Sequence, residues 1–192
     1  MARIIVTEFV SLDNVFEDPG GSENFEYGGW TFEFPGEDRY QFKFEETNET
    51  DALLLGRVTY EGFAAAWPSR EGEFADKFNS MPKYVVSSTL KDPDWQNTTV
   101  LEGDPLEAVE RLKEEQDGTL AVHGSAQLVQ TLLEHDLVDE LRLMVFPVTL
   151  GSGKRLFADT SEKMPLQLVD SKTVGDGVAI LVYKPAESSR AK

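Results

Sequence analysis

The sequence of 192 residues predicts an α/β fold: a mixed, mainly parallel sheet with helices on both faces, closed by an antiparallel hairpin. Short apolar runs alternate with amphipathic helical patterns up to about residue 150. Two apolar runs near the C-terminus, 166–174 and 178–183, flank Gly175-Asp176-Gly177, which is typical of a hairpin turn. Because helices supply the crossovers that parallel strands need, this order favours a parallel sheet with an antiparallel edge.

The first strand is predicted from Ile4 to Val10, where apolar residues dominate. Residues 11–36 are rich in Gly, Asp, Glu and aromatics and read as a loop; a loop that long within a compact domain is usually functional. A helix is predicted to begin near Glu37, although the spacing of its aromatic residues is nearer two than 3.6.

The middle of the chain repeats a strand-then-helix pattern. The helix at 105–115 has the strongest signals, because Asp104 can cap it, Pro105 suits the first position, and Glu107 completes a capping-box pattern. The remaining predicted strands are 52–55, 83–88, 98–101, 120–122 and 141–148, and the remaining helices are 58–66 and 125–134.

The composition is that of one soluble domain. Apolar residues make up 40% of the chain, enough for a single core, so residues 1–185 are interpreted as one domain and 186–192 as a disordered tail. No apolar run approaches the roughly 20 residues that span a bilayer, and the N-terminus is too quickly polar for a signal peptide. The absence of cysteine excludes disulfides and is compatible with the cytoplasm; with two histidines, no metal site is expected.

The formal charge of −17 argues against general affinity for nucleic acid or anionic membrane, so a small-molecule substrate is expected. An anionic ligand is still compatible with this charge if it is held by local N–H groups and a few cations. Fields that extend beyond about 8–10 Å are screened at physiological salt.

Two strand-to-helix junctions, at 53–61 and 119–133, suit such a ligand. Each directs unpaired backbone N–H groups and the positive end of a helix dipole at one point, which favours a phosphate. Two anion sites in one small domain indicate a ligand with more than one phosphate group, and a dinucleotide is the first candidate.

Five short motifs occur in a recognisable order: Ser11-Leu12-Asp13, Leu55-Gly56-Arg57-Val58-Thr59-Tyr60-Glu61, Val85-Val86-Ser87-Ser88-Thr89-Leu90, His123-Gly124-Ser125 and Pro147 to Phe157. Together they resemble the dihydrofolate-reductase-like superfamily, and within it the riboflavin-biosynthesis reductase (RibD) C-terminal domain. The resemblance covers residues 3–184. It implies a central sheet of about eight strands, NADPH as hydride donor, and a homodimer.

The resemblance implies a first set of cofactor contacts at the upstream junction. Gly56 leaves room for a phosphate, and Arg57 and Thr59 match phosphate contacts. Ser87 and Ser88 match the strand end that meets the adenosine 2′-phosphate, although they are equally able simply to terminate a strand. Hydroxyls and a guanidinium, without an acidic residue for the ribose, favour NADPH over NADH.

The second phosphate turn is implied at four residues: His123, Gly124, Ser125 and Ala126. His123 stands where many relatives have glycine, so its backbone conformation must be one that a non-glycine residue tolerates. Its side chain reads more readily as packed than as catalytic. By the same alignment, the backbone of residues 9–11 and Phe16 would face the nicotinamide.

The substrate side is implied by the loop around Gly151, which closes over the substrate, and by Lys154 and Arg155, whose charges suit a phosphate or carboxylate. Asp13 is expected to shape this region rather than to donate protons. Trp30, with other loop aromatics, would cover a flat ring, although core packing explains it equally well.

Asp38 is the candidate proton donor, because hydride transfer to C=N or C=O needs a proton at the other atom. Alternatively, it is a first-turn acid that complements the helix dipole. Three functions stay open: an NADPH-dependent reductase that acts on a small heterocyclic or ribosylamino substrate, as in reduction of a ribosylaminopyrimidine in the riboflavin pathway; a dihydrofolate reductase; or a catalytically silent, dimeric NADP-binding module.

Overall fold

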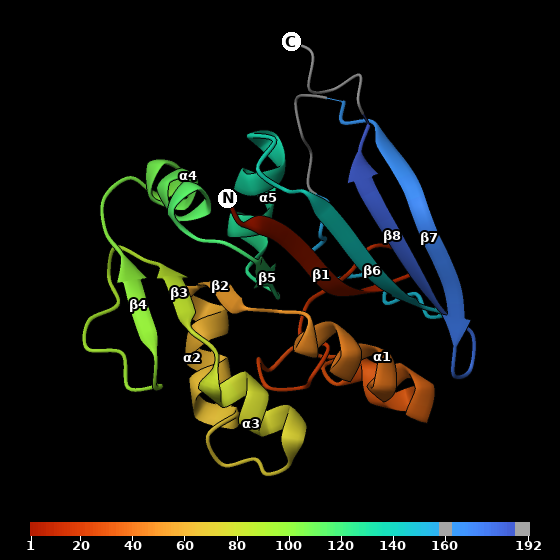
Figure 1. Cartoon of the computed structure of the whole chain (residues 1–192). Helices are drawn as coiled ribbons and strands as arrows, with labels where there is room; N and C mark the ends of the chain where they lie inside the picture. The colour runs from red at the N-terminus through yellow and green to blue at the C-terminus, as the bar shows by residue number, and fades with distance from the viewer. Residues whose placement is uncertain (158–162, 187–192) are drawn as a thin grey trace.

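The computed structural model describes residues 1–157 and 163–186 and contains one eight-stranded sheet in the order β4-β3-β2-β5-β1-β6-β8-β7 (Figure 1). Neighbouring strands from β4 to β6 are parallel, and the pairs β6–β8 and β7–β8 are antiparallel. This confirms the predicted fold class. The strands are β1 (Arg3–Ser11), β2 (Ala52–Gly56), β3 (Lys83–Val86), β4 (Thr98–Leu101), β5 (Thr119–Val122), β6 (Glu140–Phe146), β7 (Leu166–Val174) and β8 (Val178–Pro185).

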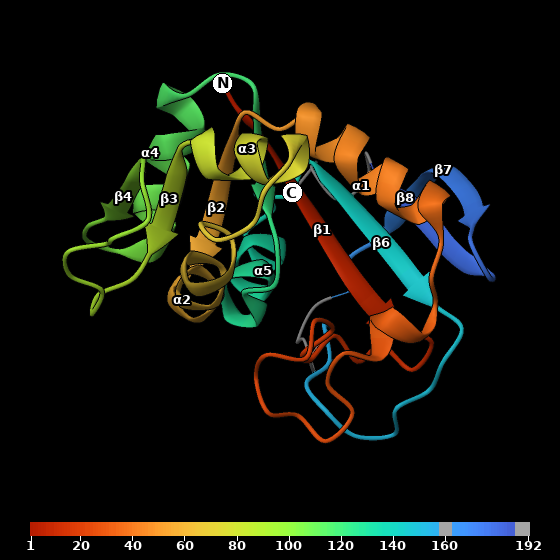
Figure 2. The same ribbon diagram turned by 90° about the horizontal axis from the view of Figure 1, so that it is seen from below.

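Helices cover both faces of the sheet (Figures 1 and 2). On one face, α4 (Pro105–Glu115) and α5 (Ala126–Glu134) bury Val109 and Leu132 against alternate residues of β1, such as Ile4. On the other face lie α1 (Glu37–Asn48), α2 (Arg57–Ala66) and α3 (Glu73–Ser80). Successive residues of β2 therefore enter different cores, as the two-residue period of a strand requires.

Most predicted elements are present. The Asp104 side chain caps α4 by accepting hydrogen bonds from the backbone N–H groups of Leu106 and Glu107, at 3.0 and 3.1 Å. The strand predicted at 83–88 ends at Val86, and that predicted at 141–148 ends at Phe146. The predicted long loop contains one short 3₁₀ helix, Trp30–Glu33.

The aromatic residues of α1 are spaced unusually for a helix because they pack against two different surfaces. Phe42 packs on the core of β6 and β8, whereas Phe44 lies against Tyr40 and against Phe74 of α3. Between them, Lys43 faces β1. α1 thus has no single apolar stripe, although it is a regular helix.

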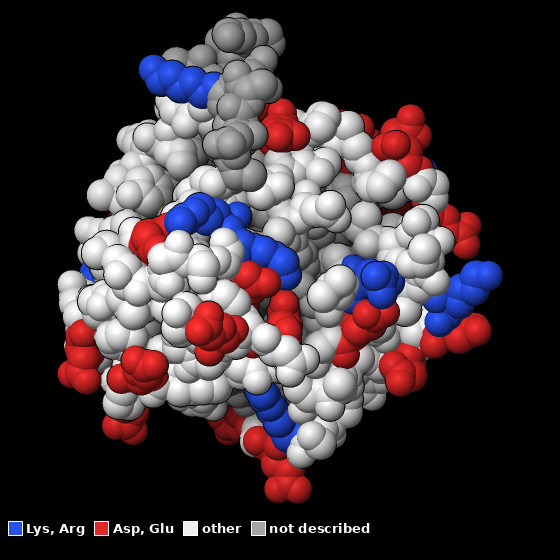
Figure 3. Space-filling model, turned by 180° about the vertical axis from the view of Figure 1, so that it is seen from behind, with Lys and Arg blue, Asp and Glu red and all other residues white. Residues whose placement is uncertain are grey.

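In the described ranges, no helix is long and apolar enough to cross a membrane. Of the tail predicted at 186–192, the structure describes only Ala186, whose backbone N–H donates to the Pro165 carbonyl at 3.0 Å. The rest of the predicted tail lies outside the described residues. Acidic side chains are spread over the face opposite that of Figure 1 (Figure 3).

Candidate cofactor and substrate site

The two predicted phosphate turns lie at the carboxyl ends of β2 and β5, which are neighbouring strands on one side of β1. β1 is the point at which the connections change direction, because β2, β3 and β4 follow on one side of it and β6, β8 and β7 on the other. In open α/β sheets, ligands bind outside the carboxyl ends of strands at such a point.

The two turns are joined by hydrogen bonds between their own residues. Gly56 N–H donates to Ser125 Oγ at 2.9 Å, and Ser125 N–H donates to Thr59 Oγ1 at 2.9 Å. Ser125 Oγ also donates to the His123 carbonyl at 3.1 Å. The sequence-predicted residues of both turns are therefore brought into one unit, although two N–H groups expected to face a phosphate are already used within the protein.

Close approach at this junction depends on glycine. Gly124 has φ +56°, and a Cβ there would lie 2.8 Å from Thr59 Oγ1. Ser125 also has a left-handed backbone, with φ 59°, whereas His123 does not, as the sequence requires of a non-glycine residue. Neither α2 nor α5 has a side-chain cap on its first N–H groups, so these donors and the helix dipoles fit a phosphorylated dinucleotide.

Arg57 and Ser87 are occupied locally. The Arg57 guanidinium forms an exposed ion pair with Glu61, one turn further along α2, at 2.9 Å. Ser87 Oγ accepts hydrogen bonds from the N–H groups of Thr89 and Leu90, which ends β3. Their roles, and that of the adjacent Ser88, at a 2′-phosphate stay predictions.

His123 places its imidazole away from the turn, among the aromatic residues of α2 and α3. Its ring centre lies 5.7 Å from that of Phe78 and 6.3 Å from that of Phe63. Burial, helped by the nearby positive charge of Lys43, lowers the pKa of His123 to about 3. The side chain is therefore neutral at physiological pH, and only its backbone belongs to the turn.

Asp13 braces the loop predicted to close over the substrate. Its carboxylate accepts hydrogen bonds from Ser11 Oγ at 2.6 Å and from the N–H groups of Leu150 and Gly151 at 3.1 and 2.8 Å. These bonds, the Ser11 hydroxyl above all, lower the pKa of Asp13 to about 2. This supports the expectation that Asp13 shapes the loop rather than donating a proton.

The two cations expected to meet substrate each contact the neighbouring loop. Lys154 Nζ lies 3.0 Å from a carboxylate oxygen of Glu17, and Arg155 donates to the Asp13 carbonyl. The contact of Lys154 and Arg155 with a substrate phosphate or carboxylate stays a prediction.

Phe16 and Trp30, the two aromatic residues of the long loop that the sequence assigned to the site, are buried. Trp30 is 2% exposed, packs edge-on against Phe146, and donates its Nε1–H to the Glu17 carbonyl. Phe16 is 6% exposed and belongs to the core beneath α5. Trp30 lines an open depression of about 480 Å³ between the loops, but core packing accounts for most of its surface.

Asp38 is engaged at the carboxyl end of β6, beside the β7–β8 turn, where it accepts two contacts from the Gly175 N–H at 3.0 and 2.9 Å. It therefore ties the start of α1 to the β7–β8 hairpin. The geometry gives Asp38 this structural contact, and a role as proton donor stays a prediction without support from its surroundings.

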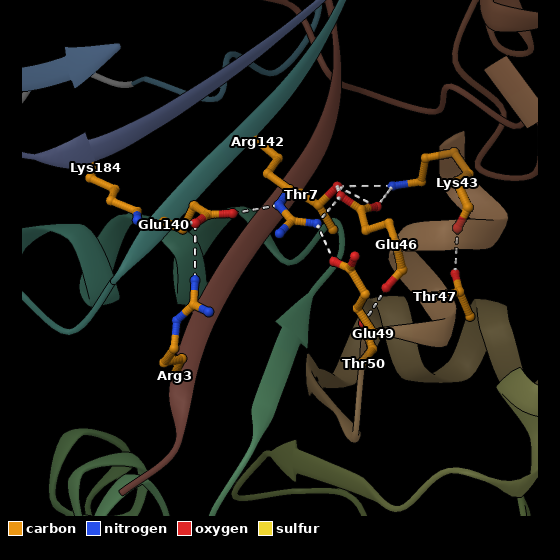
Figure 4. Close-up of polar contacts among 10 residues, drawn as sticks. All are labelled: Arg3, Thr7, Lys43, Glu46, Thr47, Glu49, Thr50, Glu140, Arg142 and Lys184. Atoms are coloured by element: carbon orange, nitrogen blue, oxygen red, sulfur yellow. Dashed lines mark hydrogen bonds and ion pairs between the residues drawn. The ribbon is translucent and has the colours of Figure 1, made fainter. Parts of the chain in front are cut away.

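A cluster that the sequence did not single out lies between α1 and β1 (Figure 4). Lys43 Nζ donates to Thr7 Oγ1 at 2.9 Å and pairs with Glu46, whose two oxygens lie 3.0 Å from the same hydroxyl. Arg142 of β6 approaches Glu46 at 3.5 Å. Burial opposes the ionisation of Glu46, but the positive charges of Lys43 and Arg142 hold its pKa below the usual value.

Thr7, Glu46 and Arg142 of this cluster line a cavity of about 230 Å³, together with other residues of β1, β5 and β6. In sequence, a Lys–Glu pair three residues apart on a helix reads as a solvated surface pair. The signal that would have found it is Thr7, a polar residue at a buried position of β1.

The comparisons with known proteins agree with this geometry. The RibD C-terminal domain family matches residues 2–180. The uncharacterized protein YyaP of Bacillus subtilis strain 168 is 31% identical over 186 residues, which cover 94% of each chain. YwjB of the same strain is 29% identical over 172 residues, covering 89% of this chain and 91% of YwjB.

Solved structures share the fold. A putative riboflavin biosynthesis protein from Shewanella sp. PV-4 superposes with a TM-score of 0.78 at 22% identity, covering 97% of this chain and all of that one. RibD of Acinetobacter baumannii gives 0.66 at 15% identity, where 97% of this chain spans 59% of the larger protein. With the interlocked turns at the sheet edge and a family match over nearly the whole length, the chain belongs to the RibD C-terminal domain family.

Proposed function

We propose that the chain is an NADPH-dependent reductase that transfers hydride to a small heterocyclic or ribosylamino substrate, with the riboflavin-pathway reduction of a ribosylaminopyrimidine as the named candidate. The family and its structural neighbours support a reductase of this general kind.

The observation that carries the proposal is the hydrogen-bonded unit of Gly56, Thr59, Gly124 and Ser125 at the switch point of the sheet. Two uncapped helices begin at this unit, and glycine leaves space at Gly124 that any side chain would fill. A dinucleotide phosphate would lie against these donors, and the bound cofactor would supply the hydride. The buried Lys43–Glu46 cluster lies on the α1 side of β1, where it would face the reacting substrate.

A paired assay separates an enzyme from a silent binding module. NADPH binding is titrated by calorimetry, and NADPH consumption is then followed with pyrimidine, pterin and carbonyl substrates. Binding together with turnover supports the reductase, binding without turnover on any of them supports a silent module, and no binding contradicts the proposal.

Arg57 provides a test of cofactor preference. We expect Arg57→Ala to weaken NADPH binding about 10- to 100-fold, as for loss of a hydrogen bond to a charged group, and to change NADH binding much less. Glu61→Gln is the matched variant: it frees the guanidinium from its ion pair and should strengthen NADPH binding. Equal weakening of both cofactors by Arg57→Ala would contradict the 2′-phosphate assignment.

A further inference from the structure

Glu8 is a carboxyl in a row of side chains that is otherwise aliphatic. Along β1, Ile4, Val6 and Val10 face the core beneath α4 and α5, and Glu8 shares their parity. The residue is only 6% exposed. β1 pairs with β5 in a register that joins Val6 to Val122, so Glu8 lies level with Gly124 and directly beneath the second turn.

The contacts of Glu8 leave its carboxyl half satisfied. The Gly124 N–H donates a hydrogen bond to it. Its Oε1 atom is fully buried and has no hydrogen-bond partner within the described part of the chain. A buried carboxylate with an orphaned oxygen is costly, whereas a protonated carboxyl carries no charge to desolvate.

The surrounding charges do not remove this cost. Burial is the dominant effect and raises the pKa of Glu8 well above its usual value; the Gly124 N–H and Lys43 oppose this, and Glu46 adds to it. Lys43 is itself paired with Glu46, and His123, directly after β5, is neutral. The first turn of α5 contributes no acidic residue, and Arg142 on β6 lies at the Glu46 side of the sheet.

We propose that Glu8 is a positioning residue for the cofactor phosphates: its protonated carboxyl holds the Gly124 turn from below, and the anionic cofactor binds tightly only while Glu8 keeps its proton. A carboxylate at this place would repel a phosphate across a single turn of backbone. Cofactor binding therefore stabilises the protonated form, and proton binding and cofactor binding support one another. This inference depends on the proposed NADPH site.

The sign of the effect follows from linkage. Because the bound phosphates raise the proton affinity of Glu8 further, NADPH affinity is complete below the pKa of Glu8 in the free protein. Above it, the affinity falls by up to about tenfold per pH unit, until the pKa of the complex is reached.

The test measures the NADPH dissociation constant by calorimetry between about pH 6 and about pH 9 for the wild type, Glu8→Gln and the surface control Glu45→Gln. The wild type and Glu45→Gln should lose affinity as pH rises, and Glu8→Gln should lose much less. Titration of the cofactor's own phosphate cancels in this comparison. Repeating the titration in two buffers of different ionisation enthalpy should show proton uptake in the wild type that is absent from Glu8→Gln.

Glu8→Met supplies a second variant of similar volume, should Glu8→Gln not fold. It should also bind with little pH dependence, and somewhat more weakly, because the Gly124 N–H loses its acceptor. Identical pH profiles for the wild type and a folded Glu8 variant, or no proton uptake by the wild type, would overturn the inference while NADPH binding itself remained. Failure of the wild type to bind NADPH at any pH would instead refute the proposed function.

Discussion

Sequence motifs place His123 in the second phosphate turn, but they do not show where its side chain packs. Its backbone belongs to the phosphate turn, but its ring packs with Phe63 and Phe78. The aromatic surroundings favour the neutral imidazole and hold its pKa to about 3. The low pKa of His123 therefore affects the pH dependence of stability rather than proton transfer to a substrate.

We predict that His123→Phe reduces the acid sensitivity of the fold. In the wild type the unfolded chain gains a proton on this histidine below about pH 6.5 and the native state does not, so stability falls as pH falls through this range. Relative to the variant, the wild type should lose about 1–2 kcal/mol of unfolding free energy between about pH 7 and about pH 5. Urea denaturation at both pH values measures this, and equal losses in the two proteins would show that His123 takes up its proton in the native state.

At the same scale, the sequence located the turn residues but not the buried charges. Gly56, Thr59, Gly124 and Ser125 follow apolar runs directly, so local sequence places them at strand ends, and the sheet brings them together. Lys43 and Glu46 meet Thr7 from a distance of 36 and 39 positions. Such contacts depend on how α1 lies across β1, which no local pattern encodes.

Among the elements, α1 is fixed at its beginning by Asp38, which lies beside the β7–β8 turn. The two Asp38 oxygens accept from the Gly175 N–H, and Gly36 packs within van der Waals reach of Gly175. This contact joins the start of the first helix to the last hairpin, between residues 137 positions apart.

We predict that Asp38→Ala lowers the unfolding free energy by about 1–3 kcal/mol, because the Gly175 N–H loses a charged acceptor. NADPH affinity should be unchanged, since Asp38 lies away from both phosphate turns. Asp176→Ala, at an exposed position of the same turn, is the control and should change stability little. A variant of normal stability with reduced turnover would instead favour Asp38 as the proton donor.

Elements with strong local signals were predictable, and those shaped by tertiary contacts were less so. α4 begins at its predicted cap because Asp104 satisfies two N–H groups whatever the rest of the fold does. The spacing in α1 resembled a strand because its aromatics pack on two surfaces. α3 was not predicted, although Phe74 and Phe78 are spaced as a helix requires, because it is short and lies in a polar stretch.

At the scale of the whole molecule, the net charge of −17 means that the acidic side chains of the folded protein repel one another. The chain has 35 acidic and 18 basic residues, and on the face that Figure 3 shows the acidic side chains are spread out rather than gathered at one site. Self-repulsion among such charges favours the expanded, unfolded chain.

We therefore predict that salt stabilises the protein. Raising NaCl from about 10 mM to about 150 mM shortens the Debye length from about 30 Å to about 8 Å and screens this repulsion. The urea midpoint should rise while the slope of the transition stays constant. A falling midpoint would show that the ion pairs of the native state outweigh the general repulsion.

The central claim, that the glycine junction between the two turns holds NADPH, is tested most directly by calorimetric titration of Gly124→Ala. A Cβ at Gly124 meets Thr59 Oγ1 at 2.8 Å and forces a strained backbone, whereas one at Gly62 of α2 meets nothing within 4 Å. We predict at least about tenfold weaker NADPH binding for Gly124→Ala, equivalent to about 1.4 kcal/mol, and wild-type affinity for Gly62→Ala, with both variants folded. Wild-type affinity in a folded Gly124→Ala protein would contradict the account.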